Sequence, residues 1–166
     1  SNGSANILVS TDLASRGLDI PDIDNIVHYH MPESEDGYIH RVGRTARWEA
    51  QGRAFFLLGP EEHIPEYVDA DVEDYEMPSE DELPAPAKPK MATIYIGKGK
   101  KDKISKGDIL GFLCKKGGLQ SSEIGKIDVN DRYAYAAIAR PKLRSVLNQV
   151  RGEKIKGVKT IVEEVR

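Results

Sequence analysis

The chain has very little cysteine and no long hydrophobic run. Its one cysteine, Cys114, excludes an internal disulfide and fits a reducing compartment, so we expect a cytoplasmic protein. The longest apolar runs are short, as in AFFLL (54–58), and no membrane partner is expected. No charged-then-apolar leader opens the chain, so the sequence does not indicate secretion.

Charge is plentiful in the chain but unevenly distributed. Residues 1–90 hold 7 basic and 19 acidic side chains, a net charge of −12, whereas residues 91–166 hold 17 basic and 8 acidic, a net charge of +9. This asymmetry indicates two units with different partners, and the basic half is a candidate polyanion binder. The alternative is that the lysines only keep a small domain soluble.

An acidic, proline-containing stretch separates the two halves. Residues 61–90 carry 11 acids and 2 lysines, with four prolines near the end. Acidic charge repels itself and proline favours extended conformations, which is typical of a linker. The first part, residues 61–71, could still form a short helix. The predicted division is a first domain over 1–76, a linker over 77–90 and a second domain over 91–166.

The first half alternates strand-like and helical segments. NILVST (6–11), NIVHYHM (25–31) and GRAFFLL (52–58) are nearly continuous apolar runs, typical of strands buried on both faces. EDGYIHRVGRTARW (35–48) is interpreted as a loop followed by a helix that starts near Gly37. The order predicts an α/β fold with a parallel sheet. Three strands are too few for an independent domain, so we expect the later half of a larger one.

The second half predicts the order βαββαβ, in which four antiparallel strands face two helices. Ser105 is a candidate N-cap of the first helix, and Leu143, Val146, Leu147 and Val150 lie at helical spacing on the second. The expected strands are 91–97, two within 123–139, and 158–165; the expected helices are 105–118 and 140–152.

Three arginines, Arg41, Arg44 and Arg47, are spaced three apart in HRVGRTAR (40–47). On a helix they would spread over about 120° and reach one side. A guanidinium forks onto phosphate oxygens, so the set suits a triphosphate or a nucleic-acid backbone. From spacing alone, a solvated face that pairs with nearby acids stays open: Glu35, Asp36 and Glu49.

The stretch STDLASRGLDIPDID (10–24), followed by HRVGRTAR, resembles the fifth and sixth motifs of the DEAD-box RNA helicases. The intervening IVHYHMPESEDGY (26–38) resembles that family's spacing. The resemblance covers residues 4 to about 76 and implies the later half of the second RecA-like domain.

The resemblance implies roles for four residues of the sixth motif. Arg44 and Arg47 match the arginine fingers that stabilise charge on the transferring phosphoryl group. His40 and Arg41 match residues that couple the nucleotide cleft to the other RecA-like domain. The intact enzyme is therefore expected to use ATP and Mg²⁺.

The fifth motif implies further contacts. Asp19 matches the carboxylate that binds the nucleotide ribose. Thr11, Arg16 and Gly17 match the segment that touches the RNA backbone and relays to the nucleotide, and Gly17 also permits close approach to a phosphate. One departure lies in the sixth motif, where Ala46 replaces the usual glycine.

Other parts of the catalytic apparatus are missing from the chain. It contains no G-x-x-x-x-G-K-[ST] and no Asp-Glu-Ala-Asp, and GKGKKDK (97–103) lacks the second glycine at the required spacing. We predict that this chain alone binds no ATP or Mg²⁺, hydrolyses no ATP and unwinds no RNA. His28 and His30 share a strand face, but no third ligand is near in sequence, so no metal site is predicted.

Three tyrosines predict a nucleic-acid surface in the basic half. Tyr133 and Tyr135 point to one face of a strand, and Tyr95 lies on the strand expected beside it. Unpaired bases stack on such rings at roughly 1–3 kcal/mol each. The alternative is that the rings simply cover the sheet. Two groups of lysines could engage phosphates: Lys98, Lys100, Lys101 and Lys103, and Lys154, Lys156 and Lys159.

The order and the aromatics of the basic half resemble an RNA recognition motif (RRM). Residues 92–166 as a whole resemble the DbpA-type RNA-binding domain, although Asp131 and Arg132 replace the usual basic residue and glycine of the longer motif. The resemblance implies a bacterial ATP-dependent RNA helicase tethered to structured RNA, with ribosomal RNA as one candidate. The alternatives are a stand-alone RNA-binding module and a protein-interaction or dimerisation domain; the oligomeric state stays open.

Overall fold

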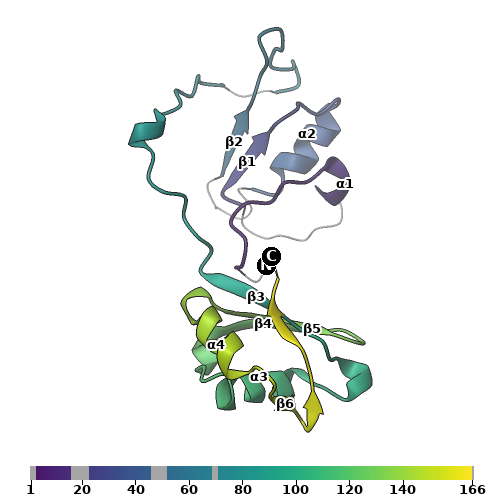
Figure 1. The fold of residues 1–166 in the computed structure, drawn as a ribbon. Helices are drawn as coiled ribbons and strands as arrows, with labels where there is room; N and C mark the ends of the chain where they lie inside the picture. The colour runs from purple at the N-terminus through teal and green to yellow at the C-terminus, as the bar shows by residue number, and fades with distance from the viewer. Residues whose placement is uncertain (1–2, 16–22, 46–51, 69–70, 166) are drawn as a thin grey trace. The chain divides into compact units, whose positions relative to one another are not determined.

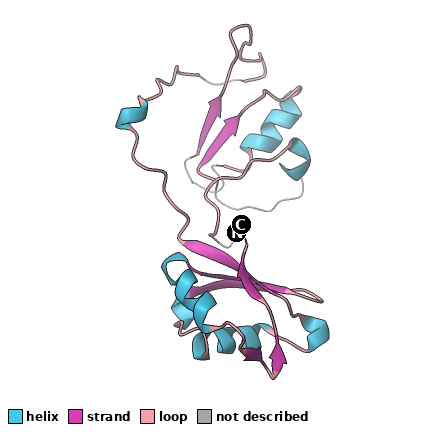
Figure 2. Ribbon diagram, viewed as in Figure 1, coloured by secondary structure: helices cyan, strands magenta, loops and turns pink. Residues whose placement is uncertain are grey.

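A computed structural model describes residues 3–15, 23–45, 52–68 and 71–165 (Figure 1). The chain divides into two compact units, residues 9–84 and residues 1–8 with 85–166. Both units combine short helices with small sheets, so the mixed α/β composition is confirmed (Figure 2). None of the described helices combines the length and apolar character that crossing a membrane requires.

In the unit of residues 9–84, the described residues form two parallel strands and two α-helices. Ile26 lies opposite Ala54 in the ladder. Its longer helix begins at Glu35, because the Ser34 hydroxyl accepts a hydrogen bond from the Gly37 N–H at 3.2 Å and caps the first turn. In chain order the elements are α1 (Asp12–Ser15), β1 (Asn25–His28), α2 (Glu35–Val42), β2 (Arg53–Phe56) and the single turn η1 (Glu80–Glu82).

A small aromatic core holds this unit together. The His28 ring, 1% exposed, stacks on Phe56 with ring centroids 5.2 Å apart and lies 5.8 Å from Tyr38. Tyr38 in turn contacts Tyr67, whose hydroxyl donates to the Pro32 carbonyl. The core therefore joins β1, β2, α2 and the segment after β2.

The strand predicted over residues 6–11 is wrong. These residues form neither helix nor strand, and Ile7 and Val9 are 83% and 93% exposed. The other two strands are shorter than predicted, and Val27 within β1 is 58% exposed. An apolar run needs strands or helices over both faces to become a buried strand, and the described residues supply too few.

The helix predicted to carry all three arginines ends earlier than expected. The helix α2 stops at Val42, with Gly43 as its C-cap. The Thr45 hydroxyl donates to the Ile23 carbonyl just before β1, which holds the chain away from the helical path. Arg44 therefore lies in the turn after α2, so the helical-face argument does not hold for it, and Arg47 lies outside the described residues.

The unit of residues 1–8 with 85–166 is called the basic unit below. The segment before residue 85 contains no α-helix among its described residues from 61 onward. Residues 61–68 form turns and extended chain, so the short helix considered for 61–71 is not seen there. The predicted linker holds only η1, where Ser79 and Glu82 form a capping box.

The basic unit has a four-stranded antiparallel sheet in the order β4-β5-β3-β8. Its two α-helices lie on the same side of this sheet (Figure 1). The elements are β3 (Met91–Ile96), η2 (Lys100–Asp102), α3 (Lys106–Lys115), η3 (Ser121–Glu123), β4 (Ile124–Val129), β5 (Ala134–Ala139), η4 (Arg140–Lys142), α4 (Leu143–Gln149), β6 (Lys154–Ile155), β7 (Val158–Lys159) and β8 (Val162–Glu164).

Alternation along the strands separates a core face from an outer face. On β3, Ala92, Ile94 and Ile96 are buried, whereas the residues between them are not. From the helices, Phe112 and Val146 are buried in the same core. The outer face is opposite α3 and α4 (Figure 1), and on it the Thr93 hydroxyl donates to the Ser4 hydroxyl at 2.8 Å.

The predicted N-cap of α3 is confirmed. The Ser105 hydroxyl accepts from the Asp108 N–H at 3.2 Å, and the Asp108 carboxylate accepts from the Ser105 N–H at 2.8 Å. Hydrogen bonds from the Ser105 hydroxyl and backbone lower the pKa of Asp108 below its ordinary value, and the Lys156 ammonium lowers it further.

The single strand predicted over residues 158–165 is wrong. It divides into β7 and β8, and β7 pairs with β6 in a separate hairpin. The turn residues Lys156 and Gly157 have φ angles of 51° and 81°. Both are in the left-handed region that a two-residue hairpin turn requires.

Candidate nucleic-acid interface

Three tyrosine rings meet on the outer face of the four-stranded sheet. The centroid of the Tyr95 ring lies 5.9 Å from that of Tyr133 and 6.0 Å from that of Tyr135, and Tyr133 and Tyr135 are 5.3 Å apart. Tyr95 is directly opposite Tyr135 in the β3–β5 ladder. The structure therefore brings all three predicted aromatic residues into one group, the tyrosine cluster.

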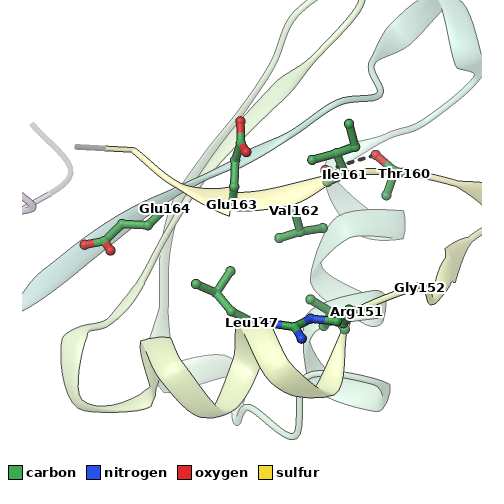
Figure 3. Close-up of a pocket in the computed structure, with 9 residues that line it drawn as sticks. Leu147, Arg151, Gly152, Thr160, Ile161, Val162, Glu163 and Glu164 are labelled. Atoms are coloured by element: carbon green, nitrogen blue, oxygen red, sulfur yellow. Dashed lines mark hydrogen bonds between the residues drawn. The ribbon is translucent and has the colours of Figure 1, made fainter.

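A carboxylate lies beside each of the two tyrosines that face each other in the ladder, so one row of side chains crosses all four strands. Asp128 on β4 lies opposite Tyr135, and Glu163 on β8 lies opposite Tyr95. Figure 3 shows Val162 pointing toward Leu147 on α4 and Glu163 pointing the other way. Asp128, Tyr135, Tyr95 and Glu163 thus form one cross-strand row, which we call the acid–tyrosine row.

A loop rich in lysine follows β3 and is held against the β4–β5 turn. The backbone N–H groups of Lys100 and Lys101 donate to the carbonyls of Asn130 and Asp131 at 2.9 and 2.8 Å. Gly99 is required there, because a Cβ atom would lie 2.2 Å from the Asn130 carbonyl oxygen. This lysine loop, residues 97–104, is therefore fixed beside the tyrosine cluster.

The four predicted lysines of this loop differ in their surroundings. The Lys98 ammonium lies 3.2 Å from Asp102, and that of Lys101 lies 4.0 Å from Asp131. A hydrogen bond from the Gly99 N–H, then one from Lys98, lowers the pKa of Asp102. Among the described residues, no carboxylate lies within ion-pair distance of the other two, Lys100 and Lys103.

The β6–β7 hairpin carries the second group of lysines. Lys154 and Lys159 are directly opposite each other in the ladder, a like-charge arrangement that destabilises an isolated hairpin. Lys156 instead bonds back to the main body, with its ammonium 3.4 Å from Asp108 and 3.2 Å from the Lys103 carbonyl. An anion would relieve the repulsion at the cross-strand pair, whereas Lys156 already has protein partners.

Two hollows lie at the edges of the four-stranded sheet. One, of about 680 Å³, opens beside Tyr135 and includes Lys100, Lys106, Asp128 and Asn130 in its lining. The other, of about 510 Å³, lies between α4 and β8 (Figure 3). The first joins the tyrosine cluster to the lysine loop, which suits a ligand with both a flat ring and an anionic group.

In the unit of residues 9–84, the Arg41 guanidinium makes hydrogen bonds to neighbouring residues of the same unit. Its guanidinium donates to both Asp12 carboxylate oxygens at 2.5 and 2.6 Å and to the His30 carbonyl at 2.7 Å. It also lies 3.3 Å from the His28 Nδ1. Burial, and then the charge of Arg41, lower the pKa of His28, which Asp12 partly opposes. Arg41 thus joins α2 to α1 and β1.

The remaining helicase-motif residues are only partly described. His40 is exposed and lies 3.5 Å from Asp36, and Thr11 is exposed immediately before α1. Arg44 in the turn and His40 on the helix bear nitrogen donors of the kind that phosphate oxygens accept. The other four predicted residues, Arg16, Gly17, Asp19 and Arg47, lie outside the described residues.

Sequence reasoning missed three residues that shape these surfaces. Asp12 lies 29 positions before its partner Arg41, and no local pattern links the two. Asp128 and Glu163 could have been found, because each alternates with core residues on its strand. Their place beside the tyrosines depends on the strand register, which the sequence does not show.

Comparison with known protein families and proteins finds matches to both halves of the chain. The family described as the DbpA RNA binding domain matches residues 93–164, and the helicase conserved C-terminal domain matches residues 1–49. The "ATP-dependent RNA helicase DbpA" of Escherichia coli is 36% identical over 160 residues, covering 94% of this chain and 35% of that protein.

Two further relatives show how the similarity is distributed. The "ATP-dependent RNA helicase DbpA" of Bacillus subtilis is 30% identical over 182 residues, covering 93% of this chain and 38% of that protein. The "ATP-dependent RNA helicase mak-5" of Neurospora crassa is 56% identical over 64 residues, covering 39% of this chain and 8% of that protein. This chain spans little more than a third of the two DbpA helicases.

The helicase segment and the RNA-binding segment therefore occur together in relatives that align with nearly the whole chain. The chain is similar to the C-terminal part of the DbpA ATP-dependent RNA helicases, and it joins a segment that matches the helicase conserved C-terminal domain to one that matches the DbpA RNA binding domain.

Proposed function

We propose that this chain is the part of an ATP-dependent RNA helicase that supplies the arginine fingers and anchors the enzyme to structured RNA. The unit of residues 9–84 would belong to a RecA-like domain, and the basic unit would be an RRM-like sandwich. The parallel pair β1–β2 and the sheet order β4-β5-β3-β8 support these two assignments.

The tyrosine cluster is the observation that carries the RNA-binding proposal. Its three rings lie in mutual contact on a face that no helix of the basic unit covers. Unpaired bases stack on such rings, and the net charge of +9 on residues 91–166 attracts the phosphate backbone. The lysine loop beside the cluster would hold the phosphates of the stacked nucleotides.

On the helicase side, Arg44 and Arg47 would contact the terminal phosphate of ATP. Bound ATP with Mg²⁺ would supply the phosphoryl group whose hydrolysis drives remodelling of RNA. Arg41 would not reach the nucleotide, because Asp12 and the His30 carbonyl already use its donors. Its role would be to hold α2 against the segment that begins at Thr11.

Titration of a labelled single-stranded RNA against the whole chain tests the RNA-binding proposal. Replacing Tyr133 and Tyr135 together by alanine is expected to weaken binding by at least about 30-fold, since each of the two stacks contributes about 1 kcal/mol or more. Tyr29→Ala, an exposed ring in the other unit, is the matched control and leaves the affinity unchanged. Equal affinity of the double variant and the wild type would transfer the site to the lysines.

A second candidate function, a dimerisation unit, is favoured by Ile161, which is 66% exposed beside the edge strand β8. Light scattering with and without RNA distinguishes the two, because an RNA-binding module stays monomeric as protein concentration rises. For the intact enzyme we propose ribosomal RNA as a target and the cytoplasm as its compartment. The match to an RNA binding domain supports RNA as the partner, and the reduced state expected of Cys114 supports the compartment.

A further inference from the structure

The acid–tyrosine row has a carboxylate at each end, on a surface that is proposed to bind the negatively charged RNA. The acid–tyrosine row lies within residues 91–166, which carry a net charge of +9, and RNA phosphates would be repelled by Asp128 and Glu163. A carboxylate on such a face is favourable only toward hydrogen-bond donors. In RNA, the donors are the ribose 2′-hydroxyls and the N–H groups of the bases, and only the base N–H groups differ from one base to another.

The ion pair of Asp128 does not exhaust its hydrogen-bonding capacity. Lys126 lies 3.1 Å from one carboxylate oxygen, and both side chains are about half exposed, at 55% and 48%. An exposed pair of this kind contributes little and can rearrange. An ionised carboxylate has about four lone-pair sites on two oxygens, so Asp128 can accept further bonds.

The hollow beside Tyr135 gives a base room to reach Asp128. Its volume of about 680 Å³ is within the usual range of ligand sites. Residues that face each other across an antiparallel ladder have Cβ atoms about 5 Å apart, so a base stacked on Tyr135 extends its edge toward Asp128. Lys100 and Lys106, also in the lining, can receive the phosphate of that nucleotide.

We infer that the hollow between Tyr135 and Asp128 selects guanine, a specificity that rests on the RNA binding proposed above. The Watson–Crick edge of guanine presents two neighbouring donors, N1–H and N2–H₂, which match the two oxygens of a carboxylate. Adenine and cytosine place an acceptor beside their donor, and uracil flanks its single donor with two acceptors. Asp128 would therefore accept two hydrogen bonds from guanine. With any other base, an acceptor atom of the base would face one of the carboxylate oxygens, which is unfavourable.

The other end of the row offers a poorer site. Glu163 is also opposite a tyrosine, but the hollow beside β8 lies between that strand and α4, and its lining includes Arg151 and Glu163 without Tyr95. A cation and a carboxylate are therefore present there without the stacking ring. The combination of ring, carboxylate and lysine in one hollow occurs at the Asp128 end.

Base preference can be measured with four pentamers of uridine in which the central position is guanine, adenine, cytosine or uracil. The wild-type chain is expected to bind the guanine pentamer on the order of tenfold more tightly than the others. Inosine at the centre keeps N1–H but lacks the N2 amino group, so it loses most of that preference. 7-Deazaguanine keeps the whole edge and retains it. These probes need no variant protein.

Two matched variants assign the preference to one side chain. Asp128→Asn is expected to bring all four pentamers to within about twofold, since an amide offers one donor and one acceptor. Asp131→Asn removes the same charge from the neighbouring exposed turn and keeps the guanine preference. A circular dichroism spectrum confirms that each variant is folded.

Each remaining outcome decides the matter. A guanine preference that survives Asp128→Asn overturns the role of Asp128. Equal binding of the four pentamers by the wild type, with loss of binding on replacement of Tyr133 and Tyr135, overturns guanine selection and leaves the RNA-binding proposal standing. Absence of binding to any pentamer overturns both.

Discussion

Arg41 and His28 are in contact, but they differ in how many of their polar atoms have hydrogen-bond partners. Arg41 uses its donors on Asp12 and on a backbone carbonyl. His28 is buried with its Nε2 atom lacking any hydrogen-bond partner in the described structure. A protonated imidazole there would be desolvated and next to the Arg41 guanidinium, so the neutral form is favoured.

We therefore predict that the unit of residues 9–84 loses stability as the pH falls from 7 to 5. The pKa of His28 is lowered in the folded state, so the unfolded chain takes up a proton first, below about 6.5. Stability is fully present above that pH and decreases below it. Protection factors of the β1 and β2 amides, measured by hydrogen exchange at both pH values, report the change.

His28→Phe separates this effect from other titrations, because a phenyl ring can stack on Phe56 without titrating. The pH-dependent loss of protection is expected to shrink in this variant. His30→Gln, which changes a histidine outside the buried core, is the control and keeps the loss. The same pH dependence in His28→Phe and in the wild type would contradict the assignment.

At the scale of elements, predictions succeeded where short-range chemistry decides the outcome. Ser105, three residues before Asp108, predicts a capped helix, and that helix begins there. Predictions failed where distant residues decide: the end of α2 depends on a bond from Thr45 to the Ile23 carbonyl. The β6–β7 hairpin was missed although its signal, Gly157 in a two-residue turn, is present in the sequence.

In the candidate nucleic-acid interface too, features set by nearby residues were predictable and features set by distant residues were not. The grouping of three tyrosines was predictable, because Tyr133, immediately before β5, and Tyr135, its second residue, are two positions apart and lie on the same side. The partners of Arg41 and the ends of the acid–tyrosine row were not predictable, since they depend on register and on contacts between segments distant in sequence.

The lysine loop provides a prediction about an element. Gly99→Ala is expected to destabilise the basic unit and to weaken RNA binding, because the added Cβ would lie 2.2 Å from the Asn130 carbonyl oxygen and 2.7 Å from the Tyr133 nitrogen. The chain would have to move away from the β4–β5 turn. Thermal unfolding followed by circular dichroism, together with RNA titration, measures both effects.

Gly111→Ala is the matched control for this substitution. Gly111 lies within α3, where an added Cβ meets nothing within 4 Å. Alanine there is expected to stabilise the unit by roughly 0.5–1 kcal/mol through helix propensity alone. Equal unfolding temperatures for the two variants would show that the loop is not held as described.

At the scale of the whole molecule, we predict no ATP turnover by this chain. The sequence contains neither a phosphate-binding loop nor an Asp-Glu-Ala-Asp segment, and the fingers alone cannot position a nucleotide. Phosphate release with ATP, Mg²⁺ and RNA is expected to be the same for the wild type and for Arg44→Ala. Release by the wild type above that of the variant would show a catalytic site that we have not identified.

The chain between the two units has a consequence for how the enzyme would find its substrate. Residues 71–84 contain only the single turn η1. A flexible segment of that length has a root-mean-square span of roughly 20 Å, and the chain also passes directly from Leu8 of one unit to Val9 of the other. RNA held by the basic unit would be presented to a helicase unit at a local concentration in the millimolar range. The helicase could then act with a weak affinity of its own, releasing each product strand quickly while the anchor keeps the target nearby.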